Sequence, residues 1–89
     1  MADARPQIDF YTFIVSLGSS ALVHLGDAPH PETRKAAEPN LPLAQQTIDV
    51  LAMLREKTKG NLTGDEEQLF DHLLRDLRLR YVEKSAGKT

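Results

Sequence analysis

The chain of 89 residues contains no cysteine, and this absence limits how so small a domain can be stabilised. Domains of this size have small hydrophobic cores, and they commonly add disulfides, a structural metal or oligomerisation. The lack of cysteine excludes disulfides and thiolate metal sites. Oligomerisation is the means that remains, and the cytoplasm is the expected location because cysteine-free short chains are more typical of reducing compartments.

The chain also lacks an excess of positive charge. Eleven Lys and Arg residues are set against thirteen Asp and Glu, so the formal net charge is -2. General nucleic-acid binders present a strongly basic surface that collects phosphates, so nucleic acid is not expected as the partner. Hydrophobic residues make up 40% of the chain and charged residues 27%, which is ordinary for a folded domain.

No hydrophobic run is long enough to cross a membrane. The most apolar stretch, residues 10–25, is shorter than the roughly 20 residues that a spanning helix needs, and it contains His24 and several serines. Asp3 and Asp9 precede it, where a signal peptide would carry a basic region. We therefore expect neither a membrane segment nor a signal peptide.

The first ordered element is predicted to be a helix over residues 10–25. Asp9 offers a side-chain oxygen as its N-cap, and Gly26 is typical of the left-handed residue that ends a helix. Residues 1–8 have no periodicity and are expected to form a flexible arm. Residues 27–39 hold three of the five prolines, which predicts an extended loop.

Two further helices are predicted, at residues 41–59 and 64–83. Asn40 caps the first of them, and Thr63 with Glu66 forms a capping box for the second. The short link between them predicts an antiparallel hairpin. The expected fold is thus all-α, a single three-helix domain over residues 9–84 with a flexible tail at 85–89.

The helix at residues 10–25 has more apolar surface than the hairpin would cover. At about 100° per residue its apolar side chains spread over roughly 200° of arc, and no charged residue lies between Asp9 and Asp27. A second copy of the chain is the simplest cover for the excess, so we expect a homodimer or small homo-oligomer. The predicted interface residues are Phe10, Phe13, Ile14, Leu17, Ala21, Leu22 and Leu25. Small residues at 16 and 18–21 form a patch that another backbone could approach closely.

Several residues of the other helices lie off the predicted core stripes. Candidate contacts with an unidentified protein partner are Met53, Arg75, Arg78, Leu79 and Arg80, together with Val82 and the 27–39 loop. Asp71 with Arg75 and Asp76 with Arg80 are predicted as ion pairs four residues apart on one helix. An alternative function is that of a nucleic-acid accessory protein, in which Arg75, Arg78, Arg80 and Lys84 contact phosphates.

No constellation of residues predicts catalysis or a cofactor. No Ser, Thr or Lys has an activating base at a recognisable spacing, so we expect no catalytic site and no enzyme activity. The three histidines match no zinc pattern, and no metal site is predicted. A metal-binding or ligand-binding protein built around His24 and His30 is the remaining alternative.

Six blocks of sequence resemble a known family. They are Phe10-x-x-Phe-Ile-Val-Ser-Leu17, Ser20-Ala-Leu-Val-His-Leu-Gly26, Asn40-Leu-Pro-Leu-Ala44, Thr47-Ile-Asp49, Glu56-Lys-Thr-Lys-Gly-Asn-Leu62 and Leu77-Arg-x-Arg-Tyr-Val82. Together they are similar to the short bacterial proteins grouped as domain of unknown function 1844. The resemblance implies a stand-alone bacterial cytosolic protein and carries over no catalytic residues. Arg34 departs from the glycine expected after Pro-Glu-Thr, which affects the expected turn geometry of that loop.

Overall fold

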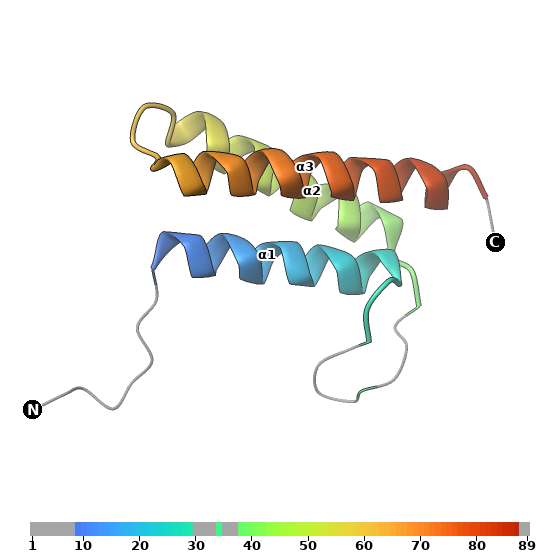
Figure 1. Ribbon diagram of the computed structural model, residues 1–89. Helices are drawn as coiled ribbons and strands as arrows, with labels where there is room; N and C mark the ends of the chain where they lie inside the picture. The colour runs from blue at the N-terminus through green and yellow to red at the C-terminus, as the bar shows by residue number, and fades with distance from the viewer. Residues whose placement is uncertain (1–8, 30–33, 35–37, 88–89) are drawn as a thin grey trace, which may run out of the picture.

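The computed structural model describes residues 9–29, 34 and 38–87, and within these ranges the only regular elements are three α-helices. They are α1 (Phe10–Leu25), α2 (Leu41–Lys57) and α3 (Gly64–Ser85), as Figure 1 shows. The predicted all-α class is confirmed. α2 ends two residues before the predicted boundary and α3 continues two residues beyond it, so Ser85 is helical. The predicted arm at residues 1–8 lies outside the described residues.

Each helix begins at the cap that the sequence predicts. The Asp9 carboxylate accepts a hydrogen bond from the Thr12 N–H at 2.8 Å, and the Asn40 side chain accepts one from the Leu43 N–H at 3.2 Å. At α3 the capping box is complete, because the Thr63 hydroxyl accepts from the Glu66 N–H while the Thr63 N–H donates to the Glu66 carboxylate. Backbone donors that lack helical partners are thereby satisfied.

Residues with a left-handed backbone conformation occur at the end of α1 and in the loop that follows it. Gly26 has a φ of 82° and its N–H donates to carbonyls of the last turn of α1, as predicted. Thr58 ends α2, and its hydroxyl donates to the Leu54 carbonyl at 2.7 Å. Arg34 is the one non-glycine residue in the described ranges with a positive φ, 60°. The position at which we expected glycine therefore has the backbone conformation that glycine adopts most easily.

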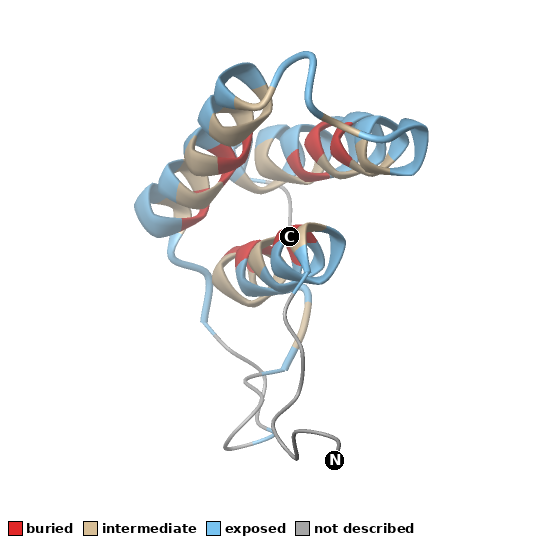
Figure 2. Cartoon of the chain, turned by 90° about the vertical axis from the view of Figure 1, so that its left-hand side faces the viewer, coloured by how far each residue is buried: buried red, intermediate tan, exposed pale blue. Residues whose placement is uncertain are grey.

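The three helices pack against one another around a single core. Figure 2 shows the buried residues on the inner sides of all three helices. Every pair of helices is in contact. The core consists of Ile14, Ala21 and Leu25 from α1, Ala44, Ile48 and Leu51 from α2, and Phe70, Leu74 and Leu77 from α3. The ring of Phe10 extends this core, with its centroid 5.9 Å from that of Phe70.

Gly18 lets α1 approach α3 closely. A Cβ at this position would lie 2.9 Å from Cδ2 of Leu73, which is shorter than side-chain carbons tolerate. Gly18 and Ala21 are both buried, whereas Ser16, Ser19 and Ser20 are exposed. The predicted small-residue patch is therefore divided between the two sides of the helix, and the glycine serves packing within the chain.

Candidate assembly surface

The side of α1 that faces away from the core is exposed and carries no charge. We call this side the outer face of α1 and define it by Tyr11, Thr12, Phe13, Val15, Ser16, Ser19 and Ser20, all of which are exposed. Tyr11, Phe13 and Val15 keep 44%, 42% and 40% of their accessible surface. The Ile14 side chain between them is fully buried. The apolar excess predicted for this helix is therefore present in the folded chain.

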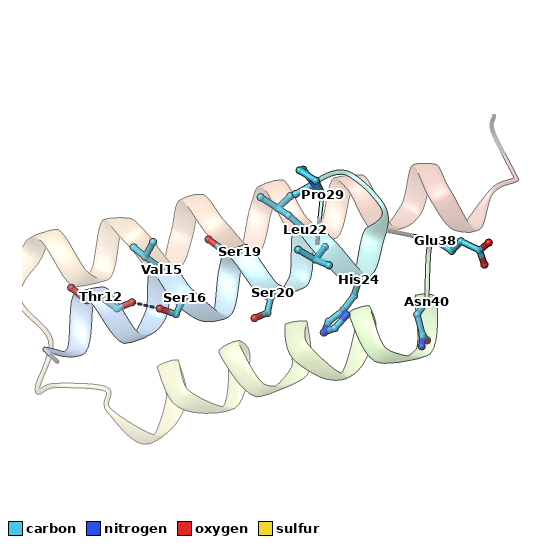
Figure 3. Close-up of a pocket in the computed structure, with 12 residues that line it drawn as sticks. Thr12, Val15, Ser16, Ser19, Ser20, Leu22, His24, Pro29, Glu38 and Asn40 are labelled. Carbon is cyan, nitrogen blue, oxygen red and sulfur yellow. Dashed lines mark hydrogen bonds between the residues drawn. The ribbon is translucent and has the colours of Figure 1, made fainter. Parts of the chain in front are cut away.

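A groove of about 760 Å³ lies along the outer face. Its floor is formed by Thr12, Val15, Ser16 and Ser19, and its far end by His24 and by residues Ala28, Pro29, Glu38 and Asn40 of the following connection (Figure 3). The Ser16 hydroxyl donates to the Thr12 carbonyl at 3.0 Å. This donor is thus satisfied within the helix, which lowers the cost of covering it with another molecule.

The predicted interface residues divide into two groups in the structure. Phe13 is exposed, and Phe10, Leu17 and Leu22 are partly buried against the core. Ile14, Ala21 and Leu25 are fully buried within their own chain, so they cannot contact a partner while the fold is intact. The surface available to a partner is shifted around the helix, towards Tyr11 and Val15, which the prediction left out.

The connection after α1 is held to the rest of the molecule at both ends. At one end the Asp27 carboxylate, whose side chain is 16% exposed, accepts from Lys84 Nζ at 2.9 Å and from Arg80 Nη1 at 3.1 Å. At the other end the Asn40 N–H donates to the His24 carbonyl at 2.7 Å. These contacts fix the residues that close one end of the groove.

The ion pairs lower the pKa of the Asp27 carboxyl below its usual value, mainly through the hydrogen bond from Lys84 and further through that from Arg80. A carboxyl group with a lowered folded-state pKa adds stability above its unfolded pKa of about 3.9, and this contribution disappears as the pH falls through the folded value. Because Arg80 and Lys84 are partly exposed, solvent screening keeps the contribution small.

We expect Asp27→Asn to lower the free energy of unfolding by about 0.5–1 kcal/mol at pH 7 and by clearly less at about pH 3. Urea unfolding of both proteins at the two pH values measures this difference. The matched change Glu56→Gln removes a carboxylate from an exposed residue of α2 and should alter stability little at either pH. An Asp27→Asn effect as large at the acidic pH as at the neutral one would show that the ion pairs are not its cause.

The candidate partner contacts on α2 and α3 have different environments. Met53, Arg75, Arg78 and Leu79 are exposed, whereas Arg80 is partly buried and binds both Asp27 and Asp76. The predicted pair Asp76 with Arg80 is confirmed at 3.0 Å. The prediction that Asp71 pairs with Arg75 is wrong, since Asp71 instead pairs with Arg55 of α2.

The two histidines that the structure describes lie on different helices. His24 is half-buried at the groove and His72 is exposed on α3, while His30 lies outside the described residues. In the part of the chain that the structure covers, no three histidine, aspartate or glutamate side chains are grouped so as to hold a metal ion. None of the helices in that part has both the length and the apolar character required to span a membrane.

Comparison with known proteins places the chain in a family. The family model described as Domain of unknown function (DUF1844) matches residues 7–83. Searches of curated proteins and of solved structures gave no match. Because the family match covers most of the residues, including all of α1 and α2, the chain belongs to the family of domain of unknown function 1844.

Proposed function

We propose that this protein is a non-enzymatic assembly module that forms a homo-oligomer through the outer face of α1. The proposal is based on the outer face of α1, which is exposed and carries no charged residue. The outer side of α1 is exposed over residues 11–20, and the 17 residues between Asp9 and Asp27 include no Asp, Glu, Lys or Arg. Solvent-exposed helix faces normally carry charged residues, so a face of this kind is typical of contact with another protein surface.

The composition of the outer face favours close helix packing. Phe13 and Val15 lie toward opposite edges of the face, and the smaller Ser16 and Ser19 lie between them. Small side chains let a second helix approach, while burial of the larger apolar groups contributes about 25 cal/mol for each Å² removed from water. A second copy of α1 offers the same uncharged surface, which makes it a suitable partner.

A charge placed in the outer face tests this proposal. We expect Val15→Glu to leave the helix content unchanged, because Val15 is exposed in the monomer, and to lower the average mass of the protein, because the contact through α1 is lost. The matched control is Met53→Glu, which puts the same charge at an exposed apolar residue of α2 and should leave the mass as in the wild type. Sedimentation velocity at micromolar concentrations gives both masses. Equal masses for Val15→Glu and wild type would overturn the proposal.

The two alternative functions have less support. The basic end of α3 could contact nucleic acid, but Arg80 and Lys84 are already engaged by Asp27, so part of that charge is neutralised within the chain. A ligand site around His24 and His30 rests on His24 alone among the described residues. A cytoplasmic location and an additional protein partner stay predictions.

A further inference from the structure

The most exposed apolar side chains in the described part of the chain lie on α3, not on α1. Leu79 and Val82 keep 58% and 60% of their accessible surface. They project from the side of α3 that faces away from Leu74 and Leu77, which are buried in the core. This second open surface is not explained by assembly through α1.

Two residues of opposite charge flank Leu79 on the same side of the helix. Arg75 precedes it by four residues and Glu83 follows it by four, so Arg75, Leu79 and Glu83 form one ridge, which we call the α3 ridge. All three residues are exposed. The ion pairs formed among the described residues involve Asp71, Asp76, Arg80 and Lys84 of this helix, but neither Arg75 nor Glu83.

The charges of the α3 ridge are complementary to those of a second copy of the ridge that runs antiparallel to it. If two such helices lie antiparallel with Leu79 at the centre, each Arg75 faces a Glu83 and the two leucines meet on the two-fold axis. Val82, next to the ridge, adds further apolar area to the contact. A contact in which the same patch serves both partners is the commonest arrangement in homo-oligomers.

We propose that the α3 ridge is a second self-association surface, in which Arg75 pairs with Glu83 of the partner subunit and Leu79 packs against Leu79 of the partner subunit. A second copy fits this ridge better than a polyanion does, because a phosphate chain lying along it would be repelled by Glu83. An acidic peptide meets the same repulsion. The alternation of positive, apolar and negative groups therefore selects a partner with the reverse order, which this helix itself provides.

This contact is compatible with assembly through α1 and does not depend on it. α1 contacts α3 on the side of Leu73, as the close approach at Gly18 shows. Arg75 lines one hollow with Tyr11 at the edge of the outer face, whereas Leu79 and Glu83 lie further along α3 and are exposed. A chain that has two separate two-fold contacts builds assemblies larger than a dimer. The α3 ridge thus predicts association beyond the α1 dimer as the protein concentration rises.

Reversing the charge of Arg75 or of Glu83, and then mixing the two variants, tests the proposed contact through the α3 ridge. All variants carry Val15→Glu, so that the outer face of α1 makes no contribution. In this background we expect Arg75→Glu or Glu83→Arg each to weaken self-association about tenfold or more, because each dimer loses two attractive pairs and gains two repulsive ones. Sedimentation velocity over a range of concentrations measures the change.

An equimolar mixture of the two variants should associate again. In the mixed dimer the glutamate introduced at position 75 of one chain faces the arginine introduced at position 83 of the other, and the two unchanged residues also form a pair of opposite charge. The matched control is Glu67→Arg, which reverses a charge outside the ridge and should change association little. Failure of the mixture to associate more strongly than either variant alone would overturn the proposal.

Cross-linking provides a second test that does not require the charge variants to associate. Because the chain has no cysteine, Leu79→Cys introduces a single thiol, and it would lie at the two-fold axis. Mild oxidation should convert most of the protein to a disulfide-linked dimer that is seen without reductant, since the two thiols lie across the axis from each other. Met53→Cys, at a similarly exposed residue of α2, should cross-link far less. Equal cross-linking of the two variants would contradict the α3 contact. The proposed contact through α1 is tested separately, by the mass of the Val15→Glu variant.

Discussion

Replacing Phe70 by alanine is expected to lower the free energy of unfolding by about 3–5 kcal/mol, a large fraction of the stability of so small a domain. Phe70 is the largest fully buried side chain among the described residues, and its ring contacts that of Phe10 at the start of α1. The substitution leaves a cavity where α1 and α3 meet. Urea or thermal unfolding followed by circular dichroism measures the loss.

The matched control is Phe13→Ala, which removes the same ring from a side chain that is 42% exposed. This variant should lose clearly less stability as a monomer than Phe70→Ala does, because part of the Phe13 ring is already in contact with water and its removal leaves no closed cavity. Its stability is compared with that of Phe70→Ala at a protein concentration low enough to prevent association. Similar losses for the two phenylalanines would contradict the assignment of one to the core and the other to the outer face.

The second large effect is expected for Gly18→Leu. The Cβ alone would approach Leu73 to 2.9 Å, and a leucine side chain would force α1 away from α3. We expect a loss of about 1–3 kcal/mol in the free energy of unfolding, the usual range for an overpacked contact between elements. Denaturant unfolding measures it.

Gly64→Leu makes the same change at a helical glycine with nothing within 4 Å of its Cβ. Since leucine forms helices better than glycine, this variant should be as stable as the wild type or slightly more stable. If Gly18→Leu were equally well tolerated, the close approach of α1 to α3 would not exist in solution.

The positions of the helices could be predicted from the sequence because their ends are determined locally. Asp9, Asn40 and Thr63 each accept a hydrogen bond from the backbone three residues ahead, and such caps depend on residues that are near one another in the chain. The end of α2 is predicted less well. Thr58 caps its last turn through the Leu54 carbonyl, inside the range 41–59 predicted for this helix, and this hydroxyl competes with continued helix.

The side of α1 that faces the core could not be predicted from the sequence. Its apolar residues spread around so much of the helix that periodicity does not separate Ile14 from Phe13. The choice depends on contacts with the other helices: Gly18 lies close to Leu73 of α3, Ile14 is fully buried, and Val15 is exposed. The sequence therefore predicts an exposed apolar surface on α1, where Tyr11, Phe13 and Val15 are exposed, but three of the interface residues that it predicts are buried within the chain.

Contacts between helices are also beyond what spacing along the sequence can predict. Spacing pairs Asp71 with Arg75 on its own helix, yet Asp71 pairs with Arg55 of α2. Asp27 is predicted only to begin a loop, yet it binds two cations of α3, one of which lies 53 residues away in the chain. Spacing along one helix reports only local neighbours, whereas these partners depend on how the helices pack.

Sedimentation equilibrium of the wild-type protein is the most direct measurement of self-association through α1. A single chain has a mass of 9.9 kDa. If a second copy covers the outer face of α1, the average mass at micromolar concentration is at least twice that of one chain and falls toward one chain on dilution. A mass of one chain that stays constant as the concentration is raised would contradict the account, because the uncharged outer face would then remain open to water.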